Sequence, residues 1–267
     1  MLELTRLKPL GAVVSGLRID ALDDEEVHDL RLLLAHHGVI VLPGQDIDDH
    51  TFLRFLRNFG PTVFTVGETP VPGFPDLNLV SNVGRARPPR STFHTDTSYV
   101  RNPPAYTALR AVQVPEHGGQ TLFADQYAAY ETLPPDVRDR LRGCNITHIM
   151  TGLDVADSVH ETRAVHPIFL RHPLSGRTAL YLSTPQRCAA VSGMPPDQAA
   201  EAVSYLFDHS TREHHIYRHA WSEGDIVMWD NRCVLHRADH NGVTGDRVMH
   251  RGMVAGHGGL DSTADTK

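Results

Sequence analysis

The segment DIVMWD, residues 225–230, decides the fold class, because it is one of several short apolar runs that favour extended structure. Similar runs are LNLVSNVG at 77–84, YTALRAVQV at 106–114, TALYLS at 178–183 and DRVMHRGMVAG at 246–256. Their length and composition predict β-strands punctuated by glycine and proline. Many short strands with few helices predict a β-sandwich or barrel that carries its helices on the outside.

The helices are predicted from apolar spacing and from the residues at their ends. In DDEEVHDLRLLLAHHG, acidic residues open a leucine-rich helix and Gly38 stops it. The short buried strand VIVLPG follows at residues 39–44. Further helices are expected in DIDDHTFLRFLRNFGP at 46–61, ADQYAAYETL at 124–133, PPDVRDRLRG at 134–143 and PPDQAAEAVSYLFDHS at 195–210.

Composition narrows the range of functions. The chain has 267 residues, of which 40% are hydrophobic and 21% charged, so we expect one domain over residues 1–267 with a frayed tail from about residue 256. A net charge of −7 argues against a nucleic-acid partner. The sequence contains no run of about 18 apolar residues, which argues against a membrane span. Three widely spaced cysteines favour neither disulfides nor a cysteine-based zinc site. We expect a cytoplasmic protein with a small-molecule partner.

The segment STFHTDTSYV, residues 91–100, places His94 and Asp96 two residues apart. On a strand both side chains would face one side, where they could hold one metal ion. His236 follows an apolar strand late in the chain, and a barrel can bring a late strand beside an early one. Two imidazoles and one carboxylate leave three coordination positions of iron open, as an Fe(II) oxygenase requires. A zinc-dependent hydrolase is the weaker alternative.

The chain resembles the taurine/dichlorophenoxyacetate dioxygenase family of Fe(II)- and 2-oxoglutarate-dependent oxygenases. The resemblance covers roughly residues 30 to 255 and is carried by the motifs FHTDTSYVRNPPAYTAL, PEHGGQTLFAD, HPLSGRTALYL, GDIVMWDNRCVLHR and DRVMHR. It implies a double-stranded β-helix, or jelly roll, and it implies that His94, Asp96 and His236 are the catalytic iron ligands. The reaction implied is O₂-dependent oxidation of a C–H bond, usually hydroxylation, with release of succinate and CO₂.

The resemblance also assigns roles beyond the metal. Arg247 falls on the arginine that grips the distal carboxylate of 2-oxoglutarate, and Thr121 falls on the threonine that supports it. Arg251 lies four residues after Arg247, and the family often uses this position to contact an acidic substrate group. A buried arginine paired with an acidic residue is the alternative for Arg251.

The substrate is less well defined. The taurine enzymes carry a histidine and a tyrosine where this sequence has Thr65 and Glu68, which argues against taurine. Tyr99 and Asn82 are candidate substrate contacts, and Arg90 is a candidate for a loop over the pocket. A noncatalytic binding module on the same barrel is a further alternative. The substrate, the oxidative outcome and homo-oligomerisation stay open.

Overall fold

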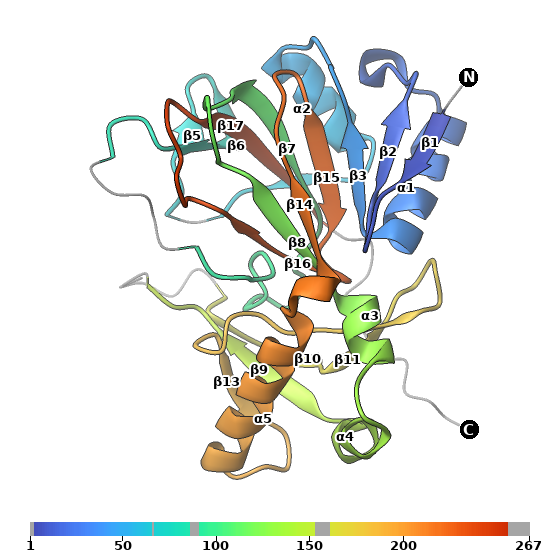
Figure 1. Cartoon of the computed structure of the whole chain (residues 1–267), viewed down its shortest axis with the longest axis vertical. Coiled ribbons are helices and arrows are strands. Elements are labelled where there is room, and N and C mark those ends of the chain that lie inside the picture. The colour runs from blue at the N-terminus through green and yellow to red at the C-terminus, as the bar shows by residue number, and fades with distance from the viewer. Residues whose placement is uncertain (1–2, 66, 86–90, 153–160, 256–267) are drawn as a thin grey trace.

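The computed structural model describes residues 3–65, 67–85, 91–152 and 161–255. This part of the chain is mainly β, with helices on the outside of the sheets, as the sequence predicts (Figure 1). The predicted frayed tail and Arg90 lie outside the described residues. Within the described ranges, no helix combines the length and the apolar character needed to cross a membrane.

A large sheet forms one wall of the fold. Its strands run in the order β1-β2-β3-β15-β7-β17-β6-β5, and β4 pairs separately with β17. All pairings are antiparallel except that of β2 with β3. The bounds are β1 Glu3–Arg6, β2 Ala12–Ser15, β3 Val39–Leu42, β4 Thr62–Val63, β5 Pro70–Val71, β6 Phe74–Ser81, β7 Pro104–Gln113, β15 Ile226–Asp230 and β17 Val248–Ala255.

A smaller sheet faces the large one and closes the core between them. It has the order β14-β8-β16, with β8 spanning Thr121–Asp125, β14 spanning Ile216–His219 and β16 spanning Val234–Ala238. Phe123 of β8 contacts Trp229 of β15, with 5.4 Å between ring centroids, inside one buried apolar cluster. The two sheets therefore enclose a packed interior.

Two helices cover the outer face of the large sheet: α1, Asp24–His37, and α2, Asp49–Arg57, preceded by the short 3₁₀ helix η1, Ile19–Ala21. Asp23 and Glu26 form a capping box at the start of α1, and Gly38 ends the helix with a φ of 74°. In β15, Met228 packs toward these helices whereas Trp229 packs into the interior. This alternation follows from the two-residue period of a strand.

The remaining elements pack on the opposite face of the small sheet (Figure 1). They are α3 Gln126–Glu131, α4 Pro135–Leu141, α5 Pro196–Ser210, η2 Glu213–His215, the sheet of β9 Asn145–Ile149, β10 Arg163–Pro167 and β13 Cys188–Val191, and the pair β11 Phe169–Arg171 with β12 Thr178–Leu180.

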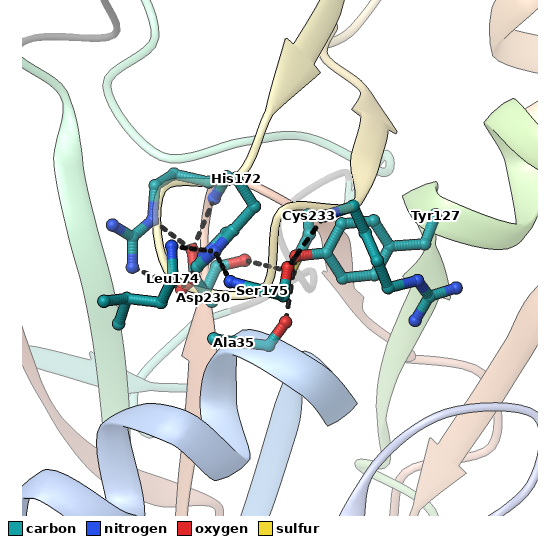
Figure 2. A network of polar contacts seen from close by, with 9 residues as sticks. Ala35, Tyr127, His172, Leu174, Ser175, Asp230 and Cys233 are labelled. Carbon is teal, nitrogen blue, oxygen red and sulfur yellow. Dashed lines mark hydrogen bonds and ion pairs between the residues drawn. The ribbon is translucent and has the colours of Figure 1, made fainter.

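A buried polar network anchors the connection between β15 and β16 (Figure 2). His172 Nδ1 accepts from the backbone N–H groups of Leu174 and Ser175, so Nε2 carries the proton and donates to Asp230 Oδ2 at 3.0 Å. Tyr127 Oη donates to the carbonyl of Ala35 and lies 2.9 Å from the Ser175 hydroxyl. His172 and Asp230 are at most 1% exposed, so water does not compete for their hydrogen bond, and Tyr127 contacts α1 through the carbonyl of Ala35.

Candidate metal centre and adjoining pocket

The middle of β16 brings His236 beside His94. The two residues form an isolated antiparallel bridge, in which each backbone N–H donates to the carbonyl of the other at 3.0 Å. The strand predicted around His94 is reduced to this single bridge. Thr95 nevertheless turns away from the site and donates to the carbonyl of Leu182 at 3.0 Å, while His94 and Asp96 face His236.

One ligand atom from each of His94, Asp96 and His236 lies within 4.8 Å of the others. Asp96 Oδ1 is 3.7 Å from His94 Nε2, and Asp96 Oδ2 is 3.5 Å from His236 Nε2. His94 Nδ1 lies 2.9 Å from the carbonyl of Thr92, which places the proton on Nδ1 and leaves the lone pair of Nε2 for a metal. Two imidazoles and one carboxylate that converge on one point fit the donor set of a non-haem Fe(II) site.

The protonation states also suit metal binding. Burial lowers the pKa of His236 to about 3, even though the carboxylate of Asp96 opposes this, so its imidazole is neutral near pH 7. Burial alone would raise the pKa of Asp96, but the neighbouring His236, His94 and Arg251 hold it well below its usual range. The site therefore offers neutral nitrogen and an ionised carboxylate, which are the forms that bind a cation.

A cavity of about 340 Å³ extends from the histidines toward β17. Its lining includes the metal-site residues His94 and His236, both predicted arginines, and side chains of β6 and β8. The lining residues are Glu68, Leu79, Val80, Ser81, Asn82, Arg85, Ser91, His94, Leu109, Thr121, Trp229, His236, Ala238, His240, Arg247 and Arg251.

Arg247 lies at one end of this cavity and is only 3% exposed. Its Nε donates to the carbonyl of Gly119 at 2.9 Å, and its Nη2 donates to Thr121 Oγ1 at 3.3 Å. Gly119 has a φ of 73°, and a Cβ there would lie 3.1 Å from Arg247 Cδ, so glycine makes room for the guanidinium. Burial lowers the pKa of Arg247 to about 10, and among the described residues no carboxylate lies within 4.0 Å of it. A buried cation in this state fits an anionic ligand.

The hydroxyl of Thr121 is arranged to donate into the cavity. Its oxygen accepts from Trp221 Nε1 at 3.0 Å and from Arg247 Nη2 at 3.3 Å. Since a hydroxyl has two acceptor lone pairs and one proton, the proton is left for a further acceptor. Trp221 was not found by sequence reasoning, because nothing in its local pattern separates a tryptophan that orients a hydroxyl from one that packs in the core.

Arg251 of β17 lines the same cavity as Arg247 and contacts two carboxylates. Its Nη2 is 3.3 Å from Glu68 Oε1, and its Nη1 is 3.7 Å from Asp96 Oδ1. The contact with Glu68 is the acidic pairing that the sequence left open as the alternative for this arginine. The Glu68 side chain is 42% exposed, so this ion pair is partly solvated and contributes little stability.

Two further residues predicted to contact the substrate occupy different positions. Asn82 lines the cavity, but its Oδ1 accepts from the backbone N–H of Arg247 at 2.7 Å and its Nδ2 donates to the carbonyl of Gly245 at 3.0 Å. These contacts position the start of β17. Tyr99 is 4% exposed, and the guanidinium carbon of Arg187 lies 5.9 Å from the centroid of the Tyr99 ring. Tyr99 is not among the residues that line the cavity. Arg85 and His240, which sequence reasoning did not single out, do line it.

Comparisons with known proteins identify similar dioxygenases. A family model described as "Taurine catabolism dioxygenase TauD, TfdA family" matches residues 3–253. The alpha-ketoglutarate-dependent 2,4-dichlorophenoxyacetate dioxygenase of Cupriavidus pinatubonensis is 31% identical over 258 residues, which cover 87% of this chain and 89% of that protein.

Solved structures confirm the predicted jelly-roll fold. A taurine dioxygenase from Burkholderia xenovorans superimposes with a TM-score of 0.83 at 27% identity, covering 96% of this chain and 91% of the other. A crystal structure of AAD-2 in complex with Mn(II) and N-oxalylglycine gives a TM-score of 0.83 at 26% identity and covers 98% of this chain and 100% of the other.

Proposed function

The chain belongs to the taurine catabolism dioxygenase TauD, TfdA family, and from that membership we propose a role for each polar side chain of the cavity. The protein is an Fe(II)- and 2-oxoglutarate-dependent dioxygenase that consumes O₂. We propose that His94, Asp96 and His236 hold the iron. Arg247 and Thr121 then bind the distal carboxylate of 2-oxoglutarate, and Arg251 binds an anionic group of the substrate.

The buried, unpaired charge of Arg247 is the observation that carries this proposal. A guanidinium that is 3% exposed and lacks a carboxylate partner among the described residues is unfavourable until an anion reaches it. The Thr121 hydroxyl beside it has a proton to donate. The same cavity leads from Arg247 to the two histidines, so an anion bound there can extend toward the metal. A zinc hydrolase has no need of 2-oxoglutarate and would give Arg247 and Thr121 no defined role. A noncatalytic binding module is disfavoured because all three candidate metal ligands are present and converge on one point.

Bound Fe(II), 2-oxoglutarate and O₂ supply the oxidising power, with succinate and CO₂ as the co-products. The protein's own residues position the reactants. The two imidazoles and Asp96 would hold the metal, and Arg247 would fix the far end of the cosubstrate. Trp229 and Leu109 contribute apolar lining to the same cavity. No side chain of the cavity has to act as an acid or base in this scheme.

We propose a small substrate that carries a carboxylate, sulfonate or similar anion. Arg251 supports this class, because it is 3.7 Å from a carboxylate oxygen of Asp96 and therefore lies beside the metal ligands. Its present partner, Glu68, would compete with the substrate's anion. The relative from Cupriavidus pinatubonensis, whose name specifies a phenoxyacetate, acts on an anion of this class.

A single catalytic domain and a cytoplasmic location are also part of the proposal. Three free cysteines support the cytoplasmic location.

Anaerobic spectroscopy tests the proposal. Addition of Fe(II) and then 2-oxoglutarate to the apoprotein should produce a metal-to-ligand charge-transfer band, which neither addition produces alone. His236→Ala, which removes one ligand, should not develop the band. Absence of the band in the wild type, or the same band in the variant, would contradict the assignment. Succinate release in the presence of a panel of small acids would then identify the substrate.

A further inference from the structure

Three consecutive hydrogen bonds connect Trp229 to the carboxylate of Asp96. Trp229 Nε1 donates to Asn231 Oδ1 at 3.2 Å, Asn231 Nδ2 donates to Thr107 Oγ1 at 2.8 Å, and Thr107 Oγ1 donates to Asp96 Oδ2 at 2.7 Å. All four residues are at most 4% exposed. Water therefore does not substitute easily for any of these bonds.

The direction of the hydrogen bonds is determined by the chemistry of the first donor. An indole N–H can only donate, so the Asn231 atom that faces Trp229 must be the amide oxygen. The amide nitrogen of Asn231 then faces Thr107 and donates to its hydroxyl oxygen. The single hydroxyl proton of Thr107 is thereby directed to Asp96. A carboxylate that receives this proton contact is favoured in its ionised form.

The residues of this chain of hydrogen bonds are held by the main fold. Trp229 and Thr107 are direct partners in the pairing of β15 with β7. The backbone N–H of Asn231 donates to the carbonyl of Ala105 at 2.8 Å. Asp230, between Trp229 and Asn231, is anchored by His172 (Figure 2). The Trp229 ring also lies against His236, with 4.5 Å between centroids, so one residue supports two of the three ligands.

We propose that Thr107 and Asn231 are positioning residues for the metal centre, which fix the rotation of the Asp96 carboxylate before the ion binds. The Thr107 hydroxyl donates to Asp96 Oδ2, and rotation about the Cβ–Cγ bond of Asp96 would break this hydrogen bond. Because both residues are buried, no water molecule replaces the lost donor easily. The inference rests on the proposed metal site. Loss of a residue that orients a ligand typically weakens metal affinity by about 10- to 100-fold, and this is the effect expected for loss of the Thr107 hydroxyl.

The test measures Mn(II) affinity of the folded apoprotein, from the free-ion signal in electron paramagnetic resonance. Thr107→Val keeps the shape of the side chain and removes the hydroxyl, so affinity should fall by about 10- to 100-fold. Thr107→Ser restores the hydroxyl and should restore most of the affinity. Thr95→Val is the matched control, because Thr95 is as buried as Thr107 and lies between His94 and Asp96 in the sequence. Its hydroxyl, however, donates to the carbonyl of Leu182 and not to a proposed ligand. This control should bind Mn(II) as the wild type does.

Trp229→Phe keeps the proposal testable if Thr107→Val does not fold. It removes the indole N–H, so the amide of Asn231 can turn over, and Mn(II) affinity should fall below that of the wild type and of Thr107→Ser. Wild-type affinity in Thr107→Val, or in Trp229→Phe when the valine variant is unfolded, would overturn the inference. Equal losses in Thr107→Val and Thr95→Val would do the same.

Asp96→Ala separates this inference from the proposed function. If the wild type and Asp96→Ala bind Mn(II) equally, the metal site itself is wrong. If Asp96→Ala loses Mn(II) while Thr107→Val retains it, only the positioning role fails.

Discussion

Replacement of Arg247 by glutamine should weaken 2-oxoglutarate binding by about 100-fold or more. Burial moves the pKa of Arg247 from its ordinary value of 12.5 to about 10. A fall of this size corresponds to a cost of about 3 kcal/mol for the buried charge. A carboxylate at the guanidinium recovers this cost, and loss of one partner from a buried charge pair is typically worth about 2–5 kcal/mol. At 1.4 kcal/mol for each tenfold change, about 3 kcal/mol gives roughly 100-fold.

The assay is an anaerobic titration of the Fe(II) protein with 2-oxoglutarate, followed through the charge-transfer band. Arg110→Gln provides the matched control, because Arg110 is also a mostly buried arginine of the large sheet but forms an ion pair with Asp49 at 2.8 Å. The control should lose folding stability and keep its 2-oxoglutarate affinity.

A second ligand shows whether the loss is specific to the distal carboxylate. Pyruvate keeps the 2-oxo acid but lacks that carboxylate. The wild type should prefer 2-oxoglutarate to pyruvate by about the factor that Arg247→Gln loses, and the variant should bind the two acids equally. If Arg247→Gln retains the wild-type preference for 2-oxoglutarate, the carboxylate is bound elsewhere and the reasoning is refuted.

Three further predictions concern the metal, the substrate and pH. His236→Ala removes one of the three proposed ligands, so equilibrium dialysis should show loss of Fe(II) binding, and retained binding would contradict this role. Glu68→Gln frees Arg251 and should lower the KM for an anionic substrate by about a few-fold, as expected for a partly exposed ion pair, whereas Arg251→Ala should raise it and spare 2-oxoglutarate. An equal loss of 2-oxoglutarate affinity in Arg251→Ala would assign this arginine to the cosubstrate. Burial lowers the pKa of His148 to about 3, so the unfolded chain, with a histidine pKa near 6.5, binds the proton first as pH falls. In urea unfolding, the loss of stability between pH 7 and pH 5 should therefore be about 2 kcal/mol smaller in His148→Asn than in the wild type, and an equal loss in both proteins would contradict the role of His148.

Local sequence signals predicted the elements that have their own start and stop chemistry. Helix α1 begins after Asp23 and ends at Gly38, as these residue types indicate. The apolar run of β15 forms a strand whose two faces are both buried. The strands β1 and β2 were not identified from the sequence. Leu4 of β1 is 41% exposed and the strand is an edge, so its sequence carries no buried pattern.

The sequence pattern suggested His94, Asp96 and His236 as a metal site, whereas the roles of Arg247, Thr121 and Arg251 come from the family resemblance alone. The pairing of Arg251 with Glu68 depends on how the loop before β5 folds over the cavity, which no local pattern encodes. The contact of Thr107 with Asp96 depends on the register of β7 against β15, and a shift of one residue would turn Thr107 to the other face. Asn82 illustrates the same limit, since its residue type suits a ligand contact as well as the backbone contacts it makes.

The position of β17 has a consequence for biosynthesis. This strand pairs with β7, β6 and β4, all of which precede it by many residues in the chain. While a ribosome is still translating residues 248–255, β6 and β7 have no strand between them and expose unpaired edges that are prone to association. Insertion of β17 is a non-local event and is expected to be slow. Its insertion also brings Arg251, and Arg247 directly before the strand, to the cavity, so the proposed 2-oxoglutarate site is complete only when the sheet is complete.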